Sequence, residues 1–453
     1  MTFQSRGGAA LAQWNQEHRL ALITTSLLLA VQLSACVPAR WPVADVESLS
    51  LLKQSPINCL LVDAAVWKNE FAEAAKAQGI TVLAAKQDGS ALSVSDVPGG
   101  PALFTLTARA KMPIEHPGAV LGTTQGVWPG VRAEEKGAVQ ARPSSSPWVD
   151  TNSGFLRFTR AVTPPATALW LANTPPENNV LGPERYIQAV ADASMAGAHW
   201  VVALDPGYWA LLRKGDEKAV TGWARINRVL KFYEDHREVA AWPDFSGLAV
   251  LQDASSGALM SGSILDMIAA KHIPARVVTP ERLPAAAPKG VRMLLNIDPS
   301  SLSQEEKDAV RGVARGGATV LSGPPAWKLA IPEGDSITFP ESSLKQMEEI
   351  WREINGVIGR RNFAVRLFGA PSMLSNLKSD ASNGRLALHL VNYSDYPVEQ
   401  ITVHLLGKYK SATLVTPAGT KKLEIYDAED ESAIDIDKVT DVALVMLEVS
   451  QVN

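Results

Sequence analysis

The sequence predicts an α/β protein in three parts: a (β/α) TIM-barrel-like domain, a flavodoxin-like α/β module and a C-terminal antiparallel β-sandwich. Short apolar runs alternate with helical patterns from Ile57 to Pro206, which is typical of βα units on a parallel sheet. A second, shorter series of the same kind runs from Leu248 to Leu321. From Arg385 onwards, strands of alternating polarity follow one another without intervening helices, as in an antiparallel sandwich.

The first series supplies the barrel-like domain, which we place at residues 37–240. A helix is predicted over Trp67–Gly79 and another over Pro183–Gly197, each ended by its glycine. The stretch from Gly126 to Pro165 is a long loop of the kind that covers a site. Because a complete barrel has about eight strands, we expect an incomplete or irregular one. The predicted strands are Ile57–Asp63, Ile80–Ala85, Ala102–Thr107, Ala119–Thr124, Ala168–Ala172 and Trp200–Asp205.

The second series supplies the flavodoxin-like module, placed at residues 241–335. Ile264, Leu265 and Ile268 have the spacing of a helix that packs on a sheet. Ser303 is predicted to cap a second helix, with acidic residues in its first turn near the positive end of the helix dipole. The predicted strands are Leu248–Gln252, Ala275–Val278, Met293–Ile297 and Ala318–Leu321.

Residues 336–453 are predicted to form a linking helix and the β-sandwich. The helix is marked by apolar residues from Leu344 to Ile358. The acidic stretch Asp427–Asp437 is interpreted as a solvated loop. The alternative is that its clustered carboxylates hold calcium, although the spacing of an EF-hand site is absent. The predicted strands are Arg385–Tyr393, Val398–Leu405, Ala412–Val415, Lys421–Ile425 and Val442–Val449.

The N-terminus carries an export signal. An apolar run from Leu20 to Leu33 follows Arg19, is too short to cross a bilayer, and ends in Leu33-Ser34-Ala35-Cys36. This pattern resembles a bacterial lipoprotein signal. The resemblance implies that residues 1–36 hold the signal peptide and lipidation site, with Cys36 as the lipidated residue. It also implies a cell-envelope lipoprotein, periplasmic or on the outer surface, held to the membrane by its lipid anchor. An ordinary signal peptide or an apolar N-terminal helix is the alternative.

Composition and motifs bear on three questions: nucleic acid as a partner, disulfides, and metals or cofactors. The formal net charge of −4 argues against nucleic acid as a partner. Cys59 is the only cysteine besides Cys36, so no internal disulfide is expected in an exported, lipidated chain. The chain has no HExxH, no paired CxxC and no glycine-rich phosphate loop, so we expect neither a metal nor an organic cofactor.

The order of the parts is similar to that of glycoside hydrolases of the type of bacterial β-galactosidases with a trimerisation domain. Phe232-Tyr233-Glu234-Asp235-His236-Arg237, just before the second series, looks like the corresponding junction there. The resemblance implies a carbohydrate as substrate, and the module suggests a homo-oligomer. That family has an Asn-Glu pair after its fourth strand, whereas Asn69-Glu70 is the only such pair here and lies in the first helix. The family's catalytic pair therefore cannot be carried over. The module also resembles glutamine amidotransferase domains, but Phe245–Pro324 contains no cysteine nucleophile.

Sites on βα barrels lie at the C-terminal ends of the strands, and four acidic residues are candidates for catalytic carboxylates there. Asp63 and Asp205 each end a predicted strand, Glu177 follows the fifth strand, and Asp150 lies in the long loop. Glycoside hydrolysis needs two such groups on either side of the scissile bond. The alternatives are that Asp63 and Asp205 cap a helix or fix a turn, that Asp150 caps the next helix, and that Glu177 is solvated.

Tryptophans gather after the same strands. Trp67, Trp128, Trp148 and Trp209 could stack on sugar rings, although core packing is the commoner fate of a tryptophan. We therefore predict a surface-anchored glycoside hydrolase-like protein that acts on an oligosaccharide through paired carboxylates. The alternative is a catalytically inactive barrel that binds glycan or supports an envelope assembly.

Overall fold

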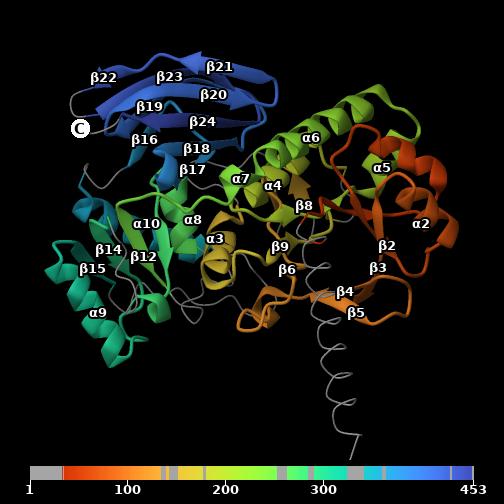
Figure 1. The fold of residues 1–453 in the computed structure, drawn as a ribbon, viewed down its shortest axis with the longest axis horizontal. Helices are drawn as coiled ribbons and strands as arrows, with labels where there is room; N and C mark the ends of the chain where they lie inside the picture. Colours follow the sequence, from red (N-terminus) through yellow and green to blue (C-terminus); the bar gives the residue numbers. More distant parts are fainter. Residues whose placement is uncertain are drawn as a thin grey trace, which may run out of the picture.

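The computed structural model describes residue 33 and residues 35–133, 139–141, 151–176, 180–252, 263–283, 290–323, 341–359, 364–428 and 431–450. Three bodies follow one another along the chain (Figure 1). The N-terminal strands and helices lie on the right of the view and a small parallel sheet lies on the left. A β-sandwich lies at the top. The fold is mixed α/β with antiparallel sheets at its C-terminus, as the sequence predicts.

The N-terminal body contains a six-stranded and a three-stranded sheet. The first has the order β11 (Val202–Ala203), β1 (Pro38–Trp41), β2 (Cys59–Asp63), β3 (Thr81–Asp88), β4 (Ala91–Ser95), β5 (Ala102–Leu106). The second has the order β10 (His199–Trp200), β9 (Ala168–Leu171), β6 (Val120–Thr123). A separate hairpin consists of β7 (Val131–Ala133) and β8 (Val139–Ala141).

The two sheets meet at both edges and close into a ring. Only Val201 separates β10 from β11, and its backbone N–H donates to the Leu171 carbonyl oxygen at 2.7 Å. On the other side, Thr107 after β5 bridges Thr123 of β6 in parallel. Alternate side chains of the strands pack together as one buried cluster, which includes Trp170 and Leu61. The interior of the ring is therefore filled with side chains, as in small closed barrels.

The ring departs from a regular (β/α) barrel. β4 runs antiparallel to both β3 and β5, and neither β1 nor β4 was predicted. β1 has four residues, includes Pro38 and Arg40, and lacks the long apolar run of a buried parallel strand. The predicted strand Trp200–Asp205 is shorter in the structure, and Asp205 caps a helix instead.

Helices pack around the outside of this body. The helices predicted over Trp67–Gly79 and Pro183–Gly197 are confirmed, and both glycines have the positive φ of a helix end. The α-helices of this part are α2 (Asn69–Lys76), α3 (Ser153–Val162), α4 (Pro183–Met195), α5 (Pro206–Arg213), α6 (Glu217–Asp235) and α7 (Arg237–Ala240). Short 3-10 turns are η1 (Val46–Leu52) and η2 (Arg109–Lys111).

The central module has a parallel sheet of order β13-β12-β14-β15, an order that also occurs at the start of flavodoxin-like sheets. Ser303 and Glu306 form a reciprocal capping box at the start of α9. The elements are β12 (Leu248–Leu251), α8 (Ser263–Ala270), β13 (Arg276–Val278), η4 (Pro280–Arg282), β14 (Met293–Asn296), α9 (Gln304–Arg315) and β15 (Thr319–Ser322). α10 (Glu341–Val357) follows and contacts α8.

The C-terminal sandwich has two antiparallel sheets. One has the order β16 (Val365–Phe368), β19 (Val398–Leu406), β23 (Glu431–Val439), β22 (Tyr426–Ala428). The other has the order β17 (Met373–Asp380), β18 (Arg385–Asn392), β24 (Val442–Val449), β20 (Tyr409–Thr416), β21 (Gly419–Leu423), with η7 (Ala381–Asn383) between β17 and β18.

The interpretation of Asp427–Asp437 as a loop is wrong. Most of this stretch belongs to β22 and β23. Ile434 and Ile436 are buried while Asp435 and Asp437 are exposed, which is the alternation of a strand with one solvated face. The carboxylates are paired along that face, since Asp437 bonds Lys421 and Asp435 accepts from Thr402. The many acidic residues of this stretch concealed the alternation of buried and exposed side chains that marks a strand.

Buried polar contacts join the three bodies at the N-terminus of α3. Asp192 of α4 is fully buried and accepts hydrogen bonds from the Thr151 hydroxyl and from the Asn152 backbone N–H at 2.6 Å. Tyr393, just after β18, donates to the same carboxylate at 2.6 Å. Asp266 of α8 accepts from the Gly154 backbone N–H at 2.6 Å. Carboxylates from two other elements thus bind N–H groups that the helix itself leaves unpaired.

No helix within the described part of the chain combines the length and the apolar character needed to span a membrane.

His389 of β18 should make the fold sensitive to acid. The side chain is 1% exposed, and neither ring nitrogen has a hydrogen-bond partner among the described residues. Burial, reinforced by the charge of Lys378, lowers the pKa of His389 from 6.5 to about 3. Below pH 6.5 the unfolded chain binds a proton that the folded chain does not, so stability falls as pH drops towards 3.

We expect the free energy of unfolding to fall by about 1.4 kcal/mol per pH unit through this histidine between those limits. Replacing His389→Leu should flatten the pH dependence of denaturant unfolding by that amount. An identical slope in the variant and the wild type would contradict the assignment.

Candidate active site at the C-terminal edge of the ring

The C-terminal ends of three adjacent parallel strands lie side by side. β1 pairs with β11 on one side and with β2 on the other. Trp41 ends β1, Asp63 ends β2, and the chain after β11 reaches Asp205 within two residues. This edge is therefore where the sequence-predicted residues should converge.

Asp63 presents an accessible carboxylate at this edge. Its side chain is exposed, and one oxygen accepts from the Ala65 backbone N–H at 2.8 Å, which fixes the turn after the strand. Cys59 and Leu61 of the same strand point into the ring. Since side chains alternate along a strand, Asp63 lies on the same inward face, at its open end.

Arg40 is the charged neighbour of Asp63. Ala39 and Trp41 pack in the outer core, so Arg40 between them faces the interior side of β1. Burial lowers the pKa of the Arg40 guanidinium, and the negative charge of Asp63 acts in the opposite direction. The two residues thus place opposite charges near each other at the mouth of the ring. Arg40 was missed from the sequence because β1 itself was not predicted.

Asp205 occupies a different environment. It is fully buried and caps α5, accepting from the Tyr208 backbone N–H at 2.8 Å. The same carboxylate accepts from the Tyr186 hydroxyl at 2.7 Å and from the Leu181 backbone N–H at 3.1 Å. Its contacts lie in the helical layer outside the ring, away from Asp63. The structure thus shows the capping role that was the alternative, and catalysis by Asp205 would require these bonds to break.

Glu177, Asp150 and Trp148 lie outside the described residues. Their assignment as site residues stays a prediction.

The remaining tryptophans divide into two groups. Trp67 and Trp209 are half-buried near the edge; Trp67 donates to the Asn69 side chain at 2.9 Å, and Trp209 packs edge-on against Trp41 at 4.9 Å. Trp128 is 4% exposed and packs against Trp200 with ring centroids 4.8 Å apart. Trp128 is therefore a core residue, and only the first two present indole surface to solvent.

Among the residues that the structure describes, no group of three or more histidine, cysteine or acidic side chains is arranged to hold a metal ion.

The fold is similar to that of glycoside hydrolases. An α-L-fucosidase, isoenzyme 2 from Paenibacillus thiaminolyticus, matches 92% of this chain and 100% of its own, with a TM-score of 0.57 and 10% sequence identity. A rhamnosidase from Novosphingobium sp. PP1Y matches 86% of this chain but 39% of its own, at 10% identity and a TM-score of 0.43. A GH42 β-galactosidase from G. stearothermophilus matches 65% of this chain and 56% of its own, at 10% identity and a TM-score of 0.41.

No protein-family model matches the sequence, and no curated protein matches it. The likeness of this chain to the fucosidase is therefore a likeness of fold, at a sequence identity of only 10%.

Asp205 should be far more important for stability than Asp63. We expect Asp205→Ala to lower the free energy of unfolding by about 2–4 kcal/mol, because it removes a helix cap and leaves the buried Tyr186 hydroxyl without its acceptor. Asp216→Ala is the matched control: it removes the exposed N-cap of α6 and should cost about 1 kcal/mol. Asp63→Asn should change stability by less than about 0.5 kcal/mol. Denaturant unfolding of the three variants measures this ranking, and equal losses for Asp205 and Asp216 would contradict it.

Proposed function

We propose that the protein is a glycoside hydrolase-like protein of the cell envelope that acts on an oligosaccharide at the C-terminal edge of the ring. The observation that carries the proposal is the accessible carboxylate of Asp63 beside Arg40, at the strand end where a fold of this kind holds its chemistry. The fold shared with a fucosidase supports a carbohydrate ligand. Trp67 and Trp209 supply partly exposed rings near the same edge, on which a sugar can stack.

Cleavage requires a second carboxyl group. One carboxyl protonates the leaving oxygen while the other attacks the anomeric carbon or activates water. With Asp205 committed to its helix cap, we assign the nucleophile or base role to Asp63 and the acid role to Glu177, which follows β9 in the chain. Asp150 is the other candidate for the acid.

The second candidate function is glycan binding without cleavage. It is favoured by the buried and fully bonded state of Asp205, which removes one of the carboxylates that the sequence offered. Under this alternative, Asp63 and Arg40 bind sugar hydroxyl groups and no glycosidic bond is broken.

Asp63→Asn and Glu177→Gln should each reduce the release of reducing ends from an oligosaccharide pool by at least about a hundredfold, since each removes a group that acts in the transition state. Glu73→Gln is the control, because Glu73 is an exposed acid on the outer helix α2. Product release that survives both site substitutions would exclude this pair. Saturable binding with no product from the wild type would favour the second candidate.

We further propose that Cys36 carries a lipid anchor at the opposite end of the ring. Cys36 is buried beside Cys59 and lies two residues before β1, so it marks the N-terminal end of the parallel strands. An anchor there leaves the C-terminal edge facing away from the membrane. Lipidation would require the Cys36 sulfur to leave the interior of the ring. Self-association of the flavodoxin-like module stays a prediction.

Cys36→Ser should release the protein from the membrane fraction or block its maturation, because no thioether to lipid can form. Cys59→Ser removes the neighbouring thiol and should leave membrane retention unchanged. Fractionation of cells that express each variant is the measurement, and retention of Cys36→Ser would count against lipidation.

A further inference from the structure

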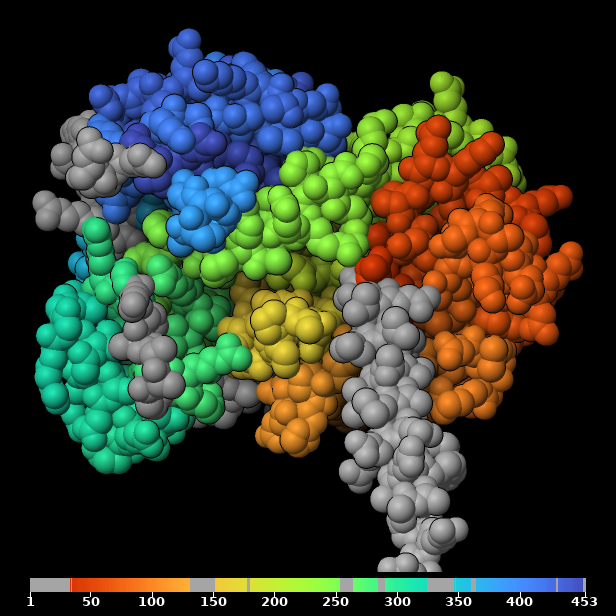
Figure 2. All heavy atoms as spheres, viewed as in Figure 1, coloured from red at the N-terminus to blue at the C-terminus, as the bar shows by residue number. Residues whose placement is uncertain are grey.

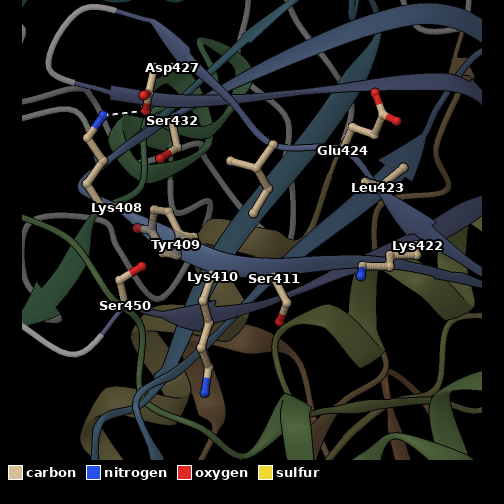
Figure 3. Close-up of a pocket in the computed structure, with 11 residues that line it drawn as sticks. Lys408, Tyr409, Lys410, Ser411, Lys422, Leu423, Glu424, Asp427, Ser432 and Ser450 are labelled. Atoms are coloured by element: carbon tan, nitrogen blue, oxygen red, sulfur yellow. Dashed lines mark hydrogen bonds and ion pairs between the residues drawn. The ribbon is translucent and has the colours of Figure 1, made fainter.

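A polar cavity that is open to solvent lies on the C-terminal sandwich. Its volume is about 790 Å³, within the range of small-ligand sites. Residues of β20, β21 and β22 and of the segments beside them line it (Figure 3). In the space-filling view the sandwich and the N-terminal strands occupy different ends of the molecule, with helical surface between them (Figure 2). The cavity is therefore separate from the site around Asp63.

Charged groups of both signs stand at the two ends of the cavity. Lys408 and Asp427 lie at one end, where they form an ion pair at 2.5 Å. Lys422 and Glu424 lie at the other end; both are exposed, and neither has a hydrogen-bond or ion-pair partner among the described residues. Lys410 also lines the cavity, and its ammonium group pairs with Glu448 at 3.3 Å.

Apolar side chains also contribute to the lining. Leu423 is 6% exposed, and Tyr409 and Ile425 are partly buried against the sandwich core. The Tyr409 hydroxyl is already used, since it donates to the Leu406 carbonyl oxygen at 2.9 Å. A ligand in the cavity therefore meets ring and aliphatic surface as well as charged donors and acceptors.

We propose that this cavity is an accessory binding site for a short neutral oligosaccharide. Sugars combine C–H faces, which pack on apolar groups, with hydroxyl groups that both donate and accept hydrogen bonds. Ammonium and carboxylate groups present together suit such hydroxyls, because one donates and the other accepts. Three lysines and two acidic side chains line the cavity, so it lacks the strong positive charge that would select a polyanion.

The inference deepens the proposed function, since it takes from it that the ligand is a glycan. An accessory site on the same chain would hold a long glycan while the ring edge acts on it. Binding of the glycan at one site would then raise its effective concentration at the other site.

The test measures binding, independently of any cleavage. Neutral tetrasaccharides (cellotetraose, maltotetraose, galactotetraose, mannotetraose and chitotetraose) are titrated by calorimetry into the full mature chain that carries Asp63→Asn. We expect saturable binding of at least one of them. Lys422→Ala and Asp427→Ala, from opposite ends of the cavity, should each weaken it by about tenfold, which is the loss of one charge-assisted hydrogen bond. Lys438→Ala, on the exposed face of β23, is the matched control and should bind like its parent.

A second measurement locates the ligand directly. Mild reductive methylation followed by mass spectrometry should show that the bound tetrasaccharide protects Lys422 several-fold and leaves Lys438 unprotected. Binding of no neutral member, binding of tetragalacturonate alone, or equal affinity in the cavity variants would each overturn the inference. Failure of the proposed function appears elsewhere, as unchanged product release by Asp63→Asn in the intact chain.

Discussion

The arrangement of the three bodies depends on how the N-terminal N–H groups of α3 are satisfied. Asp192 of α4 binds the Asn152 N–H, and Asp266 of α8 binds the Gly154 N–H. Burial raises the pKa of both carboxyls, and hydrogen bonds from their neighbours oppose that shift. Because Tyr393 donates to the same Asp192, helix, module and sandwich share one hydrogen-bonded cluster. Breaking one member would leave buried polar groups unpaired, which is costly in a low-dielectric interior.

The closed ring decides where chemistry can occur. Its interior is filled by side chains such as Trp170 and Phe104, so no ligand can enter it. Reactive groups must therefore stand at the open ends of the strands. Among the predicted carboxylates that the structure describes, Asp63 is accessible there. Asp205 is buried and already accepts hydrogen bonds from Tyr186 of α4 and from the backbone of α5.

Likeness of fold does not by itself decide which residues of this protein act in chemistry. The chain follows a fucosidase over nearly its whole length at 10% identity, a level at which the backbone arrangement persists while site residues are free to change. A strand-end aspartate can serve as catalyst or as helix cap, and the surrounding donors decide which. At Asp205 three donors converge on the carboxylate, whereas at Asp63 a single backbone N–H does so.

Local patterns in the sequence determined most of the helices and the buried parallel strands, because apolar periodicity and glycine end signals act within a few residues. They also placed Asp63 at a strand end. They did not reveal β1 or β4, which are only four and five residues long, nor β16 and β17 at the start of the sandwich, nor the strand period within Asp427–Asp437. The position of Arg40 near Asp63, the burial of Trp128 and the bonds of Asp205 to Tyr186 and Leu181 were decided by tertiary structure alone. Each depends on contacts between residues distant in the chain, which no local pattern encodes.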